Sequence, residues 1–161
     1  MMSKTRRRSD LIWRLMRPLN RHVVPKAAKT KRMSSLVLLL TTTGRKSGLP
    51  RTTPLQYETL GGIYYLGSAR GQGADWYMNI LSNHKVQIQI GEKKWDAIAE
   101  AVSDNQRIAD FLELRMKHRP LMIRAMLFTH GVMGKIDRSK LEKLAHELAL
   151  VVVTPDYSEG K

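Results

Sequence analysis

The sequence predicts an α+β fold in which a mainly antiparallel barrel of six strands is flanked by helices. Six short segments are apolar throughout or alternate between apolar and polar residues, as strands do. Four of them are joined by tight connections, which favour antiparallel neighbours. Most of the helical patterns lie in one block before the last strand. At 161 residues, 42% of them apolar, the chain suits one globular domain.

The six strands are expected at residues 35–43, 51–59, 63–69, 86–90, 95–102 and 148–155. Glycines mark the turns between them. Gly44 and Gly48 separate the first two strands, "LGG" joins the second to the third, and "GEKK" joins the fourth to the fifth. Pro54 lies inside the second strand and cannot donate a ladder hydrogen bond, so it indicates an edge or a bulge.

Helices are expected over "ADWYMNILSNH" and at about 104–117, 121–128 and 139–147. Ser103 or Asp104 caps the first of the last three, and Asp137 or Ser139 caps the third. Pro120 divides the first from the second, because proline breaks a helix interior.

The two ends of the chain differ in charge. Residues 1–32 hold 11 of the 28 lysines and arginines but only one of the 14 acidic residues, Asp10. We expect a basic N-terminal helix and linker over residues 1–32, and a barrel domain over 33–161 with a helical insertion at about 104–147. The N-terminal helix has an apolar stripe of Leu11, Ile12, Leu15, Met16 and Leu19.

This N-terminal arm allows three interpretations. Its stripe packs on the barrel, or the helix lies on an anionic membrane surface, or its basic residues bind nucleic acid. The third is disfavoured because Trp13 is the only aromatic residue of the arm. Arg14 and Arg17 interrupt any secretory signal, and no apolar run approaches the roughly 20 residues that span a bilayer. We expect a cytoplasmic protein that is soluble or peripheral at the inner face of the membrane.

Several kinds of chemistry are disfavoured by the sequence. The chain has no cysteine, which excludes disulfides and thiolate sites. Its five histidines lack the paired spacing of metal ligands, so no metal site is expected. No serine lies in a nucleophile elbow, and no pair of carboxylates suggests acid–base work. An enzyme built on this chain would depend on a cofactor.

The segment "TGRKSG" between the first two strands is a candidate anion site. Two glycines allow the backbone to turn with its amides inward, while Arg45, Lys46 and Ser47 converge. Arg51 follows as a bidentate fork. The alternative is a solvated basic turn.

A second candidate site is "GSARGQGADWY", residues 67–77. Small residues at the end of a strand would let a flat ring approach the backbone. Arg70 adds a positive charge, and Trp76 and Tyr77 follow at the start of a helix. The alternative is a glycine-rich loop with Trp76 buried in the core.

Taken in order, "LLLTTTGRKSGLPRTTPLQY", "GG", the small-residue loop and "WYMNILSNHKVQIQI" resemble the deazaflavin-dependent nitroreductase family. The resemblance covers about Leu36 to Val102 and returns at "LALVVVTP". It implies a split β-barrel related to the flavin mononucleotide (FMN)-binding barrels, with coenzyme F420 as cofactor. Residues 104–147 do not match the aromatic-rich segment that lines the substrate side in that family.

The resemblance also implies roles for residues. The cofactor's phosphate and acidic tail would be held by Arg45, Lys46, Ser47, Gly48 and Arg51. The deazaflavin ring would lie against Thr53, Pro54 and Leu55 and be completed by Ser68, Ala69, Arg70, Trp76 and Tyr77. Ser68 or Tyr57 would donate a proton or hydrogen bond to the acceptor.

The function implied is hydride transfer between coenzyme F420 and an electron-poor acceptor such as a quinone or a nitroaromatic. The alternatives are a carrier that holds a flavin such as FMN, a tetrapyrrole or a lipid in the same barrel, and a nucleic-acid-binding protein. Apolar residues of the helical segment either form a wall of the acceptor pocket or pack against the barrel: Phe111, Leu114, Leu121, Met122, Met126 and Phe128.

Overall fold

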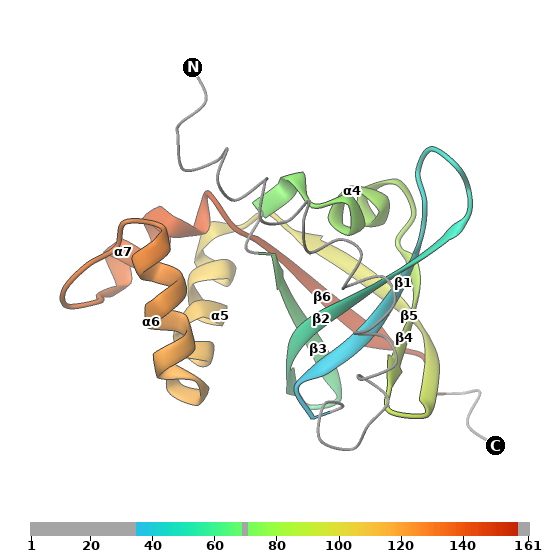
Figure 1. The fold of residues 1–161 in the computed structure, drawn as a ribbon, viewed down its shortest axis with the longest axis horizontal. Coiled ribbons are helices and arrows are strands. Elements are labelled where there is room, and N and C mark those ends of the chain that lie inside the picture. Colours follow the sequence, from blue (N-terminus) through green and yellow to red (C-terminus); the bar gives the residue numbers. More distant parts are fainter. Residues whose placement is uncertain (1–34, 69–70, 158–161) are drawn as a thin grey trace.

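The computed structural model describes residues 35–68 and 71–157 of the chain. Its strands close into one barrel in the order β1–β2–β3–β6–β5–β4, and all neighbours pair antiparallel. The predicted six-stranded α+β barrel is thus confirmed (Figure 1). The strands are β1 (Val37–Thr43), β2 (Pro50–Leu60), β3 (Ile63–Ser68), β4 (Lys85–Ile90), β5 (Lys93–Val102) and β6 (Ala149–Pro155).

Alternate residues of the strands fill the barrel interior. Leu38 and Leu40 on β1 are fully buried and lie among Leu66, Ile88 and Val151 of the other strands. Such alternation follows from the strand period of two, which sends successive side chains to opposite faces. The apolar and alternating segments of the sequence therefore encode the inside of the barrel.

Helix α4 (Asp75–Ser82) covers one end of the barrel, preceded by the short 3-10 helix η1 (Gly71–Gly73) (Figure 1). Trp76, Tyr77 and Ile80 of α4 belong to the same buried cluster as the barrel interior. The barrel and α4 therefore share one core.

A second core lies outside the barrel, under α5 (Asn105–His118), α6 (Pro120–Thr129) and α7 (Arg138–Ala145). These helices stand together on one side of the barrel (Figure 1). Phe111 of α5 stacks on Tyr65 of β3, with ring centroids 6.2 Å apart. Gly67 makes this approach possible, since a Cβ there would lie 3.0 Å from the Phe111 ring.

The helix boundaries follow the predicted caps. Asp104 accepts a hydrogen bond from the backbone N–H of Gln106, and Asp137 accepts one from that of Lys140. Pro120 begins α6, where a missing N–H costs nothing. The last helix ends at Ala145 rather than near 147, because the chain turns tightly there to enter β6.

Gly71 provides a test of how the chain must turn after β3. It has a φ of +59°, and a Cβ there would lie 2.3 Å from the carbonyl oxygen of Glu147. Gly71→Ala is expected to lower the free energy of unfolding by about 2–4 kcal/mol, from left-handed strain plus a backbone clash. Chemical denaturation followed by circular dichroism measures the change.

Gly73, in the same turn, is the matched control. A Cβ there meets nothing within 4 Å. Gly73→Ala should change stability by well under 1 kcal/mol. Equal effects of the two substitutions would contradict the described path of the chain.

Candidate functional site

The hinge between β1 and β2, residues 44–49, is a tight and well-defined turn. The Gly48 N–H donates to the Gly44 carbonyl at 2.7 Å, and the Gly44 N–H donates to the Leu49 carbonyl at 2.8 Å. Gly48 has a φ of +67°, which favours glycine. Ser47 Oγ accepts a hydrogen bond from the Leu49 N–H at 3.3 Å. The two glycines of "TGRKSG" therefore set the shape of the hinge.

Arg45 fastens the hinge to α4. Its backbone N–H and its Nη1 both donate to Asn79 Oδ1 at 3.1 Å. Its Nη2 pairs with Asp75 Oδ1 at 3.1 Å. The guanidinium of Arg45 thus already contacts a carboxylate and an amide, and these contacts hold the hinge against α4.

Asn79 is the residue on which this arrangement rests. Its side chain is buried, and its Nδ2 donates to Thr42 Oγ1 of β1 at 3.0 Å. The side-chain amide of Asn79 therefore joins α4 to the end of β1 and to the hinge. Sequence reasoning missed Asn79, and the only available signal was a polar residue inside the apolar helix "DWYMNILS".

The remaining polar residues of the hinge face solvent. Lys46, Ser47 and Arg51 are all exposed, and Arg51 Nη2 lies 3.5 Å from Ser47 Oγ. The ion pairs of the described residues include Arg45 but neither Lys46 nor Arg51. Two cations and a hydroxyl are therefore available to an anion on the solvent side of the hinge.

The adjoining part of β2 has an open edge. Pro50–Gln56 pairs with β1, whereas pairing with β3 begins only at Tyr57. On the β3 side, residues 50–56 therefore have no strand partner among the described residues (Figure 1). Pro54 lies on this open edge, which agrees with the expected edge position. A planar ligand would find backbone groups here that no neighbouring strand satisfies.

The family model for F420H(2)-dependent quinone reductases matches residues 14–126. The chain belongs to this family. An F420H(2)-dependent quinone reductase of Mycobacterium tuberculosis is 38% identical over 68 residues, which cover 40% of this chain and 46% of that protein. The chain thus spans about half the length of the curated relatives it matches. The resemblance found in the sequence is confirmed at the level of the family.

Solved structures agree on the fold. A structure described as an F420-H2 dependent reductase, FDR-A, superposes with a TM-score of 0.50 at 23% identity, covering 73% of this chain and 92% of that one. HutZ, the haem storage protein of Vibrio cholerae, gives 0.53 at 15% identity, covering 85% and 91%. At such identities the likeness shows the barrel alone.

The residues that the family resemblance assigns to the ring site are partly brought together. Thr53, Pro54 and Leu55 lie half-buried on the open edge, and Ser68 is buried at the end of β3. Ala69 and Arg70 lie outside the described residues.

Trp76 and Tyr77 belong to the barrel core, which is the alternative considered for Trp76. Their rings contact each other edge to face, with centroids 6.2 Å apart. Their side chains therefore support the end of the barrel next to the hinge rather than project from it.

Tyr57 faces the barrel interior with Tyr64, at a ring-centroid distance of 5.6 Å. Burial raises the pKa of the Tyr57 phenol above its usual value near 10. The negative charge of Glu58 also raises this pKa, whereas the positive charge of Arg119 partly offsets the increase. Burial and Tyr157 raise the pKa of Tyr64 to about 12. Both phenols therefore stay protonated at neutral pH and can donate a hydrogen bond.

A buried charged cluster on the outer face of β2 was also missed by sequence reasoning. The Glu58 carboxylate is buried and pairs with Arg115 Nε at 3.4 Å and Arg119 Nε at 3.3 Å. His118 Nδ1 lies 3.3 Å from its other oxygen, and Arg115 also donates to Gln56. The cluster fixes the junction of α5 and α6 to β2, next to the point where pairing with β3 begins.

The helical segment does not gather one apolar wall. Phe111 is buried against β3, whereas Leu121 and Phe128 are exposed on α6. Leu114, Met122 and Met126 are half-buried. The packing interpretation therefore holds for Phe111, and Met122 and Met126 also pack against the second core, whereas Leu121 and Phe128 stay exposed.

Two hollows occur on the surface of the described residues, one away from the hinge and one beside its ends. An open polar hollow of about 650 Å³ is bounded by the start of α5 and by α7, around Asn105 and His146. A second hollow, of about 440 Å³, lies near the adjacent ends of β1, β4 and β5. The first hollow does not reach the open edge, whereas the second touches its first residue, Pro50. Within the part of the chain that the structure describes, no group of three His, Asp or Glu could hold a metal.

Asn79 can be tested directly. Asn79→Ala is expected to lower the free energy of unfolding by about 1–3 kcal/mol, because the buried Thr42 hydroxyl and the Arg45 N–H lose their partner. Chemical denaturation measures this loss. Ser82→Ala, an exposed position on the same helix, is the control and should leave stability unchanged. An Asn79→Ala protein as stable as the parent would show that the hinge does not depend on this amide.

Proposed function

We propose that this protein is an F420-dependent reductase that transfers a hydride between coenzyme F420 and an electron-poor acceptor such as a quinone or nitroaromatic. The observation that carries the proposal is the hinge, where two cations outside any described ion pair adjoin an open strand edge in a member of this family. Coenzyme F420 has a phosphodiester and glutamate tail joined to a planar ring. When bound, it supplies the hydride, so the protein contributes orientation and electrostatics.

The hinge fits the acidic tail of the cofactor. Lys46 and Arg51 would hold its phosphate and carboxylates, with Ser47 donating a hydrogen bond and Gly48 leaving room for the backbone to approach. Arg45 would position the hinge without contacting the tail as closely, because its contacts to Asp75 and Asn79 of α4 fix the direction in which the hinge points.

The open edge of β2 fits the planar ring. Thr53, Pro54 and Leu55 would form one side of the ring site, and Ser68 would approach from the end of β3. Ala69 and Arg70 belong to the same proposal, although they lie outside the described residues. Trp76 and Tyr77 would act through the core by supporting α4.

The acceptor requires a hydrogen-bond or proton donor beside the ring. Ser68 and Tyr57 both face the barrel interior from neighbouring strands, and Tyr57 lies opposite Leu66 on β3. Because burial raises its pKa, the Tyr57 phenol keeps its proton at neutral pH. Either residue would then donate to the developing charge on the acceptor oxygen.

A non-catalytic carrier is the second candidate, because the same barrel occurs in a haem storage protein. In that case the pocket would hold FMN, a tetrapyrrole or a lipid without turnover. The hinge favours the first proposal, since a lipid or tetrapyrrole offers fewer anionic groups than the cofactor tail.

The N-terminal arm and the location of the protein also remain proposals. The arm lies outside the described residues, so its membrane, barrel and nucleic-acid interpretations stay predictions. Among residues 35–68 and 71–157, no helix is both long and apolar enough to cross a bilayer. We propose a cytoplasmic location, with the arm as one contact to the inner face of the membrane.

The tail clamp is tested by changing Lys46. Lys46→Ala is expected to weaken binding of oxidised coenzyme F420 by about tenfold or more, because a charge-assisted contact is lost. Quenching of tryptophan fluorescence during titration measures the affinity. Lys94→Ala removes an equal charge from an exposed position on β5 and should bind like the parent. If Lys46→Ala binds as tightly as the parent at low salt, the hinge is only a solvated turn.

The choice of cofactor is tested by comparing coenzyme F420 with FMN. F420 is expected to bind more tightly, and its advantage should shrink with rising salt, because its longer anionic tail makes more screened contacts. Reduced F420 mixed with enzyme and a quinone should be reoxidised faster than without enzyme. Tighter binding of FMN, with no reoxidation of F420, would move the protein to the carrier or flavoenzyme interpretation.

A further inference from the structure

Helix α6 carries an apolar face that points away from the protein. Leu121, Ala125 and Phe128 recur at helical spacing, and Leu121 and Phe128 are 83% and 64% exposed. The opposite face holds Ile123 and Leu127, which are fully buried. The helix is therefore apolar on both sides, although only one side is used in the described core.

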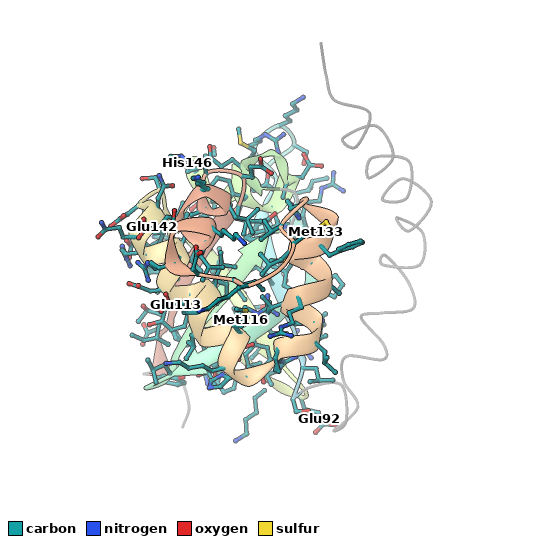
Figure 2. All side chains as sticks on the ribbon, turned by 90° about the vertical axis from the view of Figure 1, so that its left-hand side faces the viewer. Glu92, Glu113, Met116, Met133, Glu142 and His146 are labelled. Atoms are coloured by element: carbon teal, nitrogen blue, oxygen red, sulfur yellow. The ribbon has the colours of Figure 1, made fainter. Side chains whose placement is uncertain are left out.

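The loop after α6 extends this face. Met133 is 68% exposed and lies beside the end of α6 (Figure 2). Lys140 Nζ donates to the carbonyls of Met133 and Lys135, at 3.1 and 2.6 Å, and so holds the loop in place. The α6 face, defined as Leu121, Ala125, Phe128 and Met133, is thus displayed by a fixed segment.

The sequence on both sides of α6 is basic. No acidic residue occurs between Glu113 and Asp137, whereas five Lys or Arg lie between them. Both flanking acids have partners within the chain. Glu113 pairs with Arg138 on the α5–α7 side (Figure 2), and Asp137 caps α7. Those five basic residues are Arg115, Lys117, Arg119, Arg124 and Lys135.

Three of these cations are available to a partner. Arg115 and Arg119 pair with the buried Glu58. Lys117, Arg124 and Lys135 are exposed. Arg124 lies on α6 between Leu121 and Phe128, and Lys117 and Lys135 lie in the segments before and after the helix, so exposed positive charge adjoins the apolar strip.

The charge of each candidate partner decides which of them fits the α6 face. The N-terminal arm holds 11 basic residues, and a second copy would bring its own basic border, so both would meet like charge. A nucleic acid would match the charge but would leave Leu121 and Phe128 unused. An anionic bilayer matches both features, because apolar side chains enter the headgroup region while Lys and Arg meet its phosphates.

We propose that the α6 face is a docking surface for an anionic lipid bilayer, which it enters in the plane of the headgroups without spanning. This proposal is independent of the reductase function and of any role of the arm. It gives the exposed Leu121, Phe128 and Met133 a common partner that the described fold does not supply.

The test is co-sedimentation of the full chain with phosphatidylglycerol vesicles and with neutral phosphatidylcholine vesicles. Leu121→Ser combined with Phe128→Ser should reduce partitioning onto the anionic vesicles by about tenfold or more, as should Arg124→Glu. Leu60→Ser with Ile98→Ser removes two other exposed apolar residues, and Lys94→Glu makes an equal charge change on β5. These control variants should bind like the parent.

Other outcomes overturn the proposal. If the parent chain does not bind anionic vesicles, or if both α6 variants bind as the parent does, this face is not the docking surface. Loss of binding only in Leu11→Ser with Leu15→Ser would assign the membrane contact to the arm instead. Sedimentation velocity without vesicles detects a second copy: a parent dimer that the α6 substitutions dissociate would show that the face joins two chains.

Discussion

The candidate site depends on one buried amide. Asn79 accepts hydrogen bonds from Arg45 of the hinge and donates one to Thr42 of β1. Three segments, α4, β1 and the hinge, therefore meet at a single side chain. Its helix also covers the end of the barrel with Trp76 and Tyr77. Core packing therefore fixes where Asn79 lies, and Asn79 fixes where the hinge points. In this way apolar packing inside the barrel sets the direction of polar groups on its surface.

The open edge beside this hinge belongs to β2. This strand pairs with β1 along its first part and with β3 only along its last part. The Glu58 cluster secures the outer face where the second pairing begins, and it does so with buried charges that need one another. An edge left unpaired in a closed barrel is usually a liability, and here it adjoins the basic hinge.

Local signals were enough to predict the barrel but not the network that orients the site. Alternation in residues 86–90 and 95–102, the turn glycines and the caps at Asp104 and Asp137 each act within a few residues, so the sequence shows them directly. The Arg45–Asn79 contact joins residues 34 apart, and Arg115 reaches Gln56 across 59. Nothing local marks such pairs. Arg45 was therefore predicted as a tail ligand, although the structure engages it with α4.

The positive charge of the protein is divided between separate places, and this division matters for how the two proposals coexist. The hinge and α6 lie on opposite sides of the barrel (Figure 1). A bilayer bound at the α6 face would leave Lys46 and Arg51 on the side of the barrel toward water, and salt screens lipid charge over a Debye length of about 8 Å. The polyanionic cofactor would then reach the hinge from solution without competing with lipid phosphates. If one basic patch bound both partners, the cofactor tail and the lipid phosphates would compete for the same cations.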